Sequence, residues 1–194
     1  MQLSSRAAAY LESLERVESV PTAKVTERLK LEGIPSFSSW TEFHDKFAGY
    51  VENIGVERAI WGLMHFASEW QDPLDVSVDR DGGEYLIGCA DVHPSYDYWL
   101  RNNGEFSGIG GGGPCESFDK KVEQTALLWS ATRVGDWSLI VDFNDWSPER
   151  QQPILAGRDR GFIPEASDKY KKCWLTDRHL VFQVRAGCTV WTRE

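Results

Sequence analysis

The sequence predicts an α+β fold with N-terminal helices, an antiparallel β-sheet with packed helices, and a C-terminal hairpin. Apolar residues recur at helical spacing in the first fifty residues and again over 117–131. The other segments read as short strands joined by glycine-containing turns. Helices and strands that are segregated along the chain are typical of α+β proteins. The 194 residues suit one domain, 1–194, with a helical part over 1–33 and a sheet-containing core over 34–194.

Three helices are expected before the first strand. The first spans Ser4 to Val17, and a second follows Pro21 and stops at Gly33. Residues 39–42 have the pattern of a capping box, with a hydroxyl first and a glutamate three residues later. The helix that they open carries aromatic residues at three- and four-residue steps, which predicts a face that docks on a sheet. These residues are Trp40, Phe43, Phe47 and Tyr50.

The strands of the first half are predicted from one apolar run and two hairpins. Residues 59–66 read as a buried central strand, in which His65 is a hydrogen-bonded core histidine. Residues 76–87 form a hairpin that turns at 80–83, and residues 96–108 form a second one. The second turn contains Asn-Asn-Gly, where we expect positive φ at both turn residues.

The second half combines one helix with a closing hairpin. The helix spans 117–131, and the apolar segment 137–143 is either a strand or a helix. Residues 145–172 read as a long loop that holds a short helix over 165–172. A last hairpin pairs 178–184 with 188–193.

The net charge of −9 is unevenly distributed. Residues 57–145 hold 16 Asp and Glu against 6 Lys and Arg, whereas residues 146–194 hold more basic than acidic residues. An acidic surface repels phosphate backbones and attracts basic proteins, so we expect a protein partner and no nucleic acid. Nine Trp residues indicate aromatic binding surface in addition to core.

The chain shows no basic start followed by an apolar run, and no apolar segment of membrane-spanning length. We therefore expect a cytoplasmic protein with no membrane partner and with free thiols. The four Cys residues have no C-x-x-C spacing, so no metal site and no cofactor are predicted.

One constellation is compatible with catalysis. The glycine run 110–113 precedes a helix, but no Lys-Ser or Lys-Thr follows it, and Glu116 would repel a phosphate. Asp91 can orient His93 as a base, and Cys89 or Cys115 can supply a nucleophile. This alternative is a small hydrolase-like enzyme. The simpler interpretation is a hydrogen-bonded turn at 93–95 and a flexible connector at the glycines.

A second constellation interleaves acidic and aromatic side chains, as protein interfaces do when aromatic anchors are combined with selective charges. Strand alternation allows only about half of them to face solvent. Asp97 belongs to the same field. The predicted partner-binding residues are Asp79, Asp81, Glu84, Asp91, Tyr96, Tyr98, Trp99, Glu105 and Glu116.

The same region resembles the SUKH superfamily of bacterial immunity proteins. The resemblance rests on the acidic Gly-Gly hairpin 78–85, the later turn at 103–104 and the helix that begins Glu116-Ser117-Phe118. It covers roughly residues 35–129, and the segments 93–99 and 110–113 are not part of that pattern. The resemblance implies an α+β core and a non-catalytic protein that binds and neutralises a cognate toxin by occluding it. Independently of the resemblance, charge and aromatic content predict a protein partner that is basic at the contact; the resemblance implies that this partner is the toxin.

Overall fold

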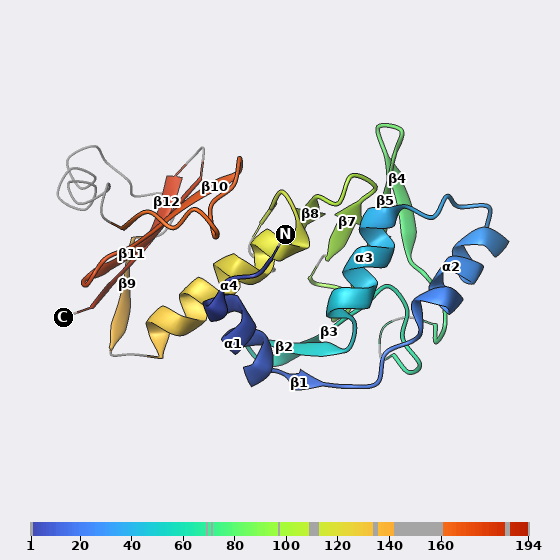
Figure 1. Cartoon of the computed structure of the whole chain (residues 1–194), viewed down its shortest axis with the longest axis horizontal. Coiled ribbons are helices and arrows are strands. Elements are labelled where there is room, and N and C mark those ends of the chain that lie inside the picture. Colours follow the sequence, from blue (N-terminus) through green and yellow to red (C-terminus); the bar gives the residue numbers. More distant parts are fainter. Residues whose placement is uncertain are drawn as a thin grey trace. The chain divides into compact units, whose positions relative to one another are not determined.

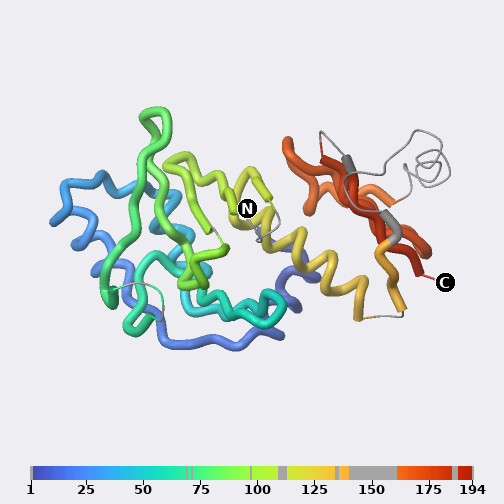
Figure 2. The backbone as a smooth tube through the Cα atoms, turned by 180° about the vertical axis from the view of Figure 1, so that it is seen from behind, coloured from blue at the N-terminus to red at the C-terminus, as the bar shows by residue number. Residues whose placement is uncertain are grey.

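The computed structural model confirms the α+β fold and describes residues 2–68, 70, 72–96, 98–108, 113–133, 136–141, 161–184 and 187–193. Asp97, glycines 110–112, residues 142–160 and the turn at 185–186 lie outside this set, so predictions made for them are not addressed. The chain forms two compact units (Figures 1 and 2). One comprises Leu11–Phe118, and the other joins Met1–Tyr10 to Asp119–Glu194. This division does not coincide with the expected boundary at residue 33.

The first two helices begin close to their predicted starts. Helix α1 (Ser5–Ser13) is capped by Ser4, whose Oγ accepts the Ala7 N–H at 3.2 Å. It is shorter than predicted because Glu15–Arg16 form strand β1, which pairs with β2 (Tyr50–Ile54). Helix α2 (Thr22–Leu31) has Pro21 as its N-cap, and Gly33 follows its end with φ +68°.

The capping box expected at 39–42 is wrong. Helix α3 (Ser38–Phe47) has Phe37 at its N-cap without a side-chain bond, and Ser39 Oγ donates to Asn102 O at 2.9 Å instead. The predicted aromatic face is buried at Trp40, Phe43 and Phe47. Tyr50 lies in β2 and not in the helix.

A four-stranded antiparallel sheet of the Leu11–Phe118 unit has the order β1-β2-β3-β6. Its strand β3 (Glu57–Trp61) is shorter than the predicted run 59–66, because the backbone leaves the strand at Gly62 with φ +151°. Strand β6 (Ala90–Asp91) pairs with its end.

The second sheet of this unit has the order β4-β5-β7-β8 and consists of the two predicted hairpins. Strands β4 (Val78–Asp81) and β5 (Glu84–Gly88) are joined by Gly82 and Gly83, both at positive φ. Strands β7 (Trp99–Arg101) and β8 (Phe106–Ser107) turn at Gly104, φ +88°. Asn103 does not share the expected positive φ; its Oδ1 accepts the Glu105 N–H instead.

An aromatic cluster forms the core of the Leu11–Phe118 unit. Phe118, the first residue of α4 (Phe118–Thr132), has ring centroids within 4.6–5.4 Å of four others. Such edge-to-face pairs stabilise a core beyond the area that they bury. The four partners are Phe43, Phe47, Trp61 and Phe106.

The other unit packs the rest of α4 with a sheet of order β10-β11-β12-β9. Its strands are β9 (Trp137–Val141), β10 (Lys171–Leu175), β11 (His179–Val184) and β12 (Gly187–Arg193). The closing hairpin is confirmed, and so is the strand alternative over 137–141, the described part of 137–143. The short helix expected over 165–172 is wrong, because Asp168 caps a turn that leads into β10 at Lys171.

All four Cys residues are free, as expected, and the structure buries each of them. Among the described residues, no helix is long and apolar enough to cross a membrane.

Candidate protein-binding surface

The register of the β4-β5-β7-β8 sheet divides its side chains between two faces. Leu86 pairs with both Asp79 and Arg101, and Asp81 pairs with Glu84, so these side chains share one face. Trp99 lies on the same face, because it is two residues from Arg101 in β7. Glu105 precedes β8, but its C=O accepts the Arg101 N–H at 2.8 Å, which continues the β7–β8 register and places Glu105 opposite Arg101. We call this set the outer face. It consists of Asp79, Asp81, Glu84, Leu86, Trp99, Arg101 and Glu105.

The opposite, inner face belongs to the core of the unit. Ile87, Leu100 and Phe106 are fully buried there. Phe37, beside helix α3, contacts Tyr85 with ring centroids 5.7 Å apart, and Trp40 Nε1 donates to Arg101 O at 3.0 Å. Because α3 anchors this face, the outer face is held on a rigid support.

Five of the nine predicted partner-binding residues therefore lie on one surface. Asp79 and Asp81 are exposed, whereas Glu84, Trp99 and Glu105 are half-buried. The outer face holds four carboxylates and one guanidinium, so its side chains carry three net negative charges. The β4–β5 hairpin that holds three of these carboxylates extends from the rest of its unit in both views (Figures 1 and 2).

Arg101 organises the carboxylates of the hairpin. Its Nη1 donates to Glu84 Oε2 at 2.6 Å, and its Nη2 donates to Asp81 Oδ2 at 3.1 Å. These hydrogen bonds, that to Glu84 first, raise the pKa of Arg101. The pairing fixes the two carboxylates and neutralises one of them, which the sequence alone does not show.

Two predicted partner-binding residues lie inside the protein. Asp91 is 5% exposed and accepts a hydrogen bond from Ser68 Oγ at 2.5 Å. Tyr98 is 3% exposed, and its hydroxyl donates to the buried Glu52 at 3.0 Å. These two side chains satisfy internal carboxylate and hydroxyl groups, so neither is available to a partner in this structure.

The remaining two predicted residues lie off the outer face. Tyr96 is half-buried in a turn, where its N–H donates to His93 O at 2.9 Å. Glu116 is exposed just before α4. Neither residue belongs to a strand, so strand register does not bring them to the outer face.

The residues of the catalytic alternative have separate partners. His93 Nδ1 accepts the Ser95 N–H at 3.2 Å, and its ring packs edge-on against Trp70. Asp91 bonds to Ser68, and Cys89 and Cys115 are fully buried. Most of the glycine run lies outside the described residues. Within the described ranges, no group of three or more His, Cys, Asp or Glu could hold a metal ion.

The sequence did not reveal how closely α2 approaches strand β4. Lys24 and Arg28, four residues apart on the helix, contact Phe66 and Asp75. Toward the C-terminal end of α2, a concave surface that encloses a volume of about 410 Å³ lies between the helix and β4. It is lined by Glu32, Ile34, Val76, Val78, Asp79, Arg80 and Tyr85. Helical spacing of 24, 28 and 32 is the signal that could have indicated one continuous contact.

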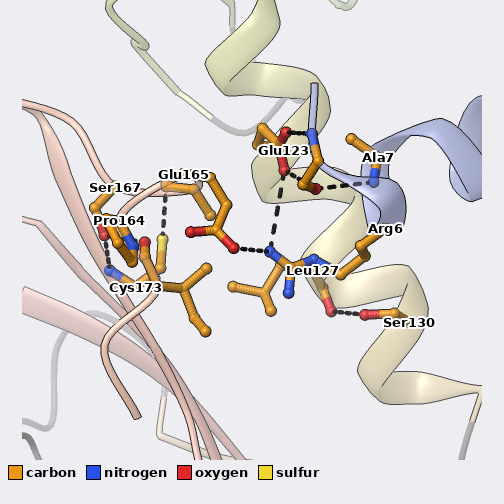
Figure 3. Close-up of polar contacts among 12 residues, drawn as sticks. Arg6, Ala7, Glu123, Leu127, Ser130, Pro164, Glu165, Ser167 and Cys173 are labelled. Atoms are coloured by element: carbon orange, nitrogen blue, oxygen red, sulfur yellow. Dashed lines mark hydrogen bonds and ion pairs between the residues drawn. The ribbon is translucent and has the colours of Figure 1, made fainter. Parts of the chain in front are cut away.

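The other unit contains a buried polar network that we interpret as structural (Figure 3). Glu123 is 0% exposed and accepts bonds from both the N–H and the hydroxyl of Ser4, at 2.6 and 2.7 Å. Arg6 lies 4.0 Å from Glu123 and 3.5 Å from Glu165. The network ties the start of α1 to α4 and to the segment before β10.

No protein-family model, curated protein or solved structure matches this chain.

Proposed function

We propose that this protein is an immunity-type protein, of the kind that the SUKH resemblance implies, which binds a toxin with a basic contact surface. The observation that carries the proposal is the strand register, which places four carboxylates and Trp99 on one exposed sheet face. Charged rims select the partner and accelerate association, while an aromatic side chain contributes contact area. Neutralisation follows from occlusion of the toxin, without catalysis and without a cofactor.

The charge pattern favours a cationic partner over an uncharged one. Two of the outer-face carboxylates, those of Asp81 and Glu84, pair with Arg101. The Asp79 carboxylate accepts the backbone N–H of Arg80. This donor is neutral, so the hydrogen bond does not compensate the negative charge of Asp79. Lys or Arg side chains of a toxin would complete these interactions, and a surface of this sign also suits the active site of a toxin that cleaves nucleic acid.

The experiment is a capture followed by neutralisation. The full chain is immobilised on a resin and incubated at low salt with an extract of its native host. The captured proteins are identified, and each is then expressed in a bacterial host. We expect one captured protein to arrest growth when expressed alone and to be harmless when this chain is co-expressed. Failure to recover a basic partner, or growth arrest that the chain does not relieve, would contradict the proposal.

The outer face is tested with charge reversals. Asp79→Lys should slow association with the captured toxin about tenfold at low salt, because steering depends on the local charge. Glu42→Lys, an exposed reversal on α3, is the matched control with the same change in net charge. Equal association rates for the two variants would exclude the outer face.

A further inference from the structure

Strand β4 is an edge strand. In the part of the chain that the structure describes, its only strand neighbour is β5. Gly88 N–H donates to Ser77 O at 2.8 Å, and β4 continues this register. Because antiparallel strands alternate hydrogen-bonded and non-bonded pairs, Val78 and Arg80 direct their backbone groups away from β5. An edge of this kind is a template for a further strand.

The surroundings of this edge differ above and below the sheet. On the outer face, Asp79 and Asp81 flank the edge with exposed carboxylates. On the inner side, the concave surface beside β4 has aliphatic walls from Ile34, Val76 and Val78. Its remaining lining is polar or aromatic and includes Glu32 and Arg80, whose guanidinium stacks on the Tyr85 ring at 4.4 Å. A strand laid along β4 would therefore alternate, with a period of two residues, between the acidic outer face and an inner side where the aliphatic side chains of Ile34, Val76 and Val78 are available between Glu32 and Arg80.

We infer that β4 receives an extended segment of the partner in which basic and aliphatic residues alternate. Its Lys or Arg side chains face Asp79 and Asp81, and its aliphatic side chains enter the concave surface. Its backbone bonds to Val78 and Arg80. The inference rests on the proposed function, for which it specifies the contact, and charge complementarity selects a basic segment over an acidic one.

Asp79 has a second role at this edge. Its Oδ1 accepts the outward N–H of Arg80 at 2.7 Å, so the free protein satisfies one of the edge donors internally. Such a bond protects an exposed edge from unselective pairing. A basic side chain of the incoming segment would draw the carboxylate away and release the N–H for the partner's carbonyl.

The probe is the peptide acetyl-Lys-Val-Lys-Val-Lys-Val-amide, titrated into the full chain and followed by amide NMR. We expect shift changes centred on Val78 and Arg80 and slowed hydrogen exchange at the Val78 amide. The same peptide with Glu in place of Lys tests the charge, and the Lys peptide with N-methylated backbone tests the strand pairing. Each should bind at least about tenfold more weakly.

Two variants test the protein side. Val78→Pro removes an outward N–H without breaking a bond to β5, and Asp79→Lys reverses the edge charge. Both substitutions should lower the affinity for the Lys peptide about tenfold, whereas the Glu42→Lys variant should bind the peptide with the affinity of the unmodified chain. The amide spectrum reports whether Val78→Pro keeps its fold, and the N-methylated peptide probes the same bonds on the unmodified chain.

The inference is overturned if the Lys peptide fails to bind, if its shifts map elsewhere, or if the N-methylated or Glu peptide binds equally. These outcomes are independent of the proposed function. If the chain neutralises a toxin but the peptide causes no shift changes at β4, only the β4 inference is refuted. Peptide binding at β4 without any neutralised toxin removes the immunity function and leaves the edge site.

Discussion

Glu123 shows how one buried carboxylate can hold distant segments together. It has no exposed surface, and two of its bonds come from Ser4, 119 residues away in the chain. A buried carboxylate is tolerated only when charged or hydrogen-bonding partners replace water. Ser4 and Arg6 provide these partners in this unit.

Glu123→Ala should lower the free energy of unfolding by about 3 kcal/mol, because Arg6 would lose its buried counter-charge and Ser4 its acceptor. Glu165→Ala removes the more exposed partner of the same arginine and should cost less than about 1 kcal/mol. Urea denaturation of both variants checks the difference, and equal losses would show that the Glu123 network is not stabilising.

From the surroundings of His44, we expect the stability of the Leu11–Phe118 unit to depend on pH. It is 2% exposed, its Nε2 lies 2.7 Å from Val20 O, and its Nδ1 accepts the Leu63 N–H. This arrangement requires a neutral ring. Burial lowers the pKa of His44, although the Val20 carbonyl opposes the shift, and burial also lowers the pKa of His65.

A lowered histidine pKa means that the unfolded chain binds more protons than the folded chain as pH falls through about 6.5. Stability should therefore be complete above this pH and should decline below it, toward the folded pKa. Urea midpoints at pH 7.5 and 5.5 test this decline, which His44→Asn should reduce. A midpoint that does not fall between these pH values would contradict the assignment.

At the scale of elements, two tight turns place the strands around α3. Gly49, just before β2, has φ +88°, and its N–H and C=O bond to Trp61 O and to the Val17 N–H. A Cβ at this position would lie 2.4 Å from Val17 O. Gly55, between β2 and β3, has φ +63°, and a Cβ there would have no other atom within 4 Å.

The two glycines make a matched pair. Gly55→Ala should lower the free energy of unfolding by about 1 kcal/mol, because alanine is strained in the left-handed conformation of this position. Gly49→Ala should cost about 2 kcal/mol more, because the methyl group displaces the backbone at Val17. Thermal unfolding of the two variants measures the difference, and equal melting temperatures would refute the steric part.

Sequence patterns predicted those helices and turns whose backbone conformation is set by their own residues. Gly82-Gly83 and Gly104 specified both hairpins, and helical periodicity specified α2 and the helix at 117–131. The failures occurred where tertiary partners decided. Ser39 bonds to Asn102 instead of capping its helix, and the 165–172 segment enters a sheet.

The candidate surface was predictable in composition but not in arrangement. The sequence identified Asp79, Asp81, Glu84, Trp99 and Glu105, and alternation implied that half of the field would be buried. Which half depended on pairing register. The edge beside α2 requires contacts between segments about fifty residues apart, such as Arg28 with Asp75, for which the chain contains no local pattern.

For the whole molecule, the division into units predicts which fragments fold. Leu11–Phe118 contains both of its sheets and the ring of Phe118 that its aromatic core surrounds. We expect the other unit to need residues 1–10. Ser4 donates a hydrogen bond to Glu123, Arg6 forms an ion pair with Glu123, and the Tyr10 ring packs on Trp129 with centroids 5.6 Å apart.

A fragment of residues 11–118 should therefore unfold cooperatively, with dispersed amide resonances. A fragment of residues 119–194 should be much less stable, because Glu123 would be left without its partners. Denaturation of both fragments, followed by circular dichroism, checks this asymmetry. A stable 119–194 fragment would show that the first ten residues are dispensable.

The bond between Ser4 and Glu123 also has a consequence for biosynthesis. Ser4 is translated before its acceptor Glu123, which follows 119 residues later in the chain. The Leu11–Phe118 unit can fold before Glu123 is available to accept the Ser4 hydrogen bond, since domains can fold as they are synthesised. Residues 1–10 thus become native after the Leu11–Phe118 unit that follows them in the chain, so synthesis from the N-terminus favours the contiguous unit over the discontinuous one.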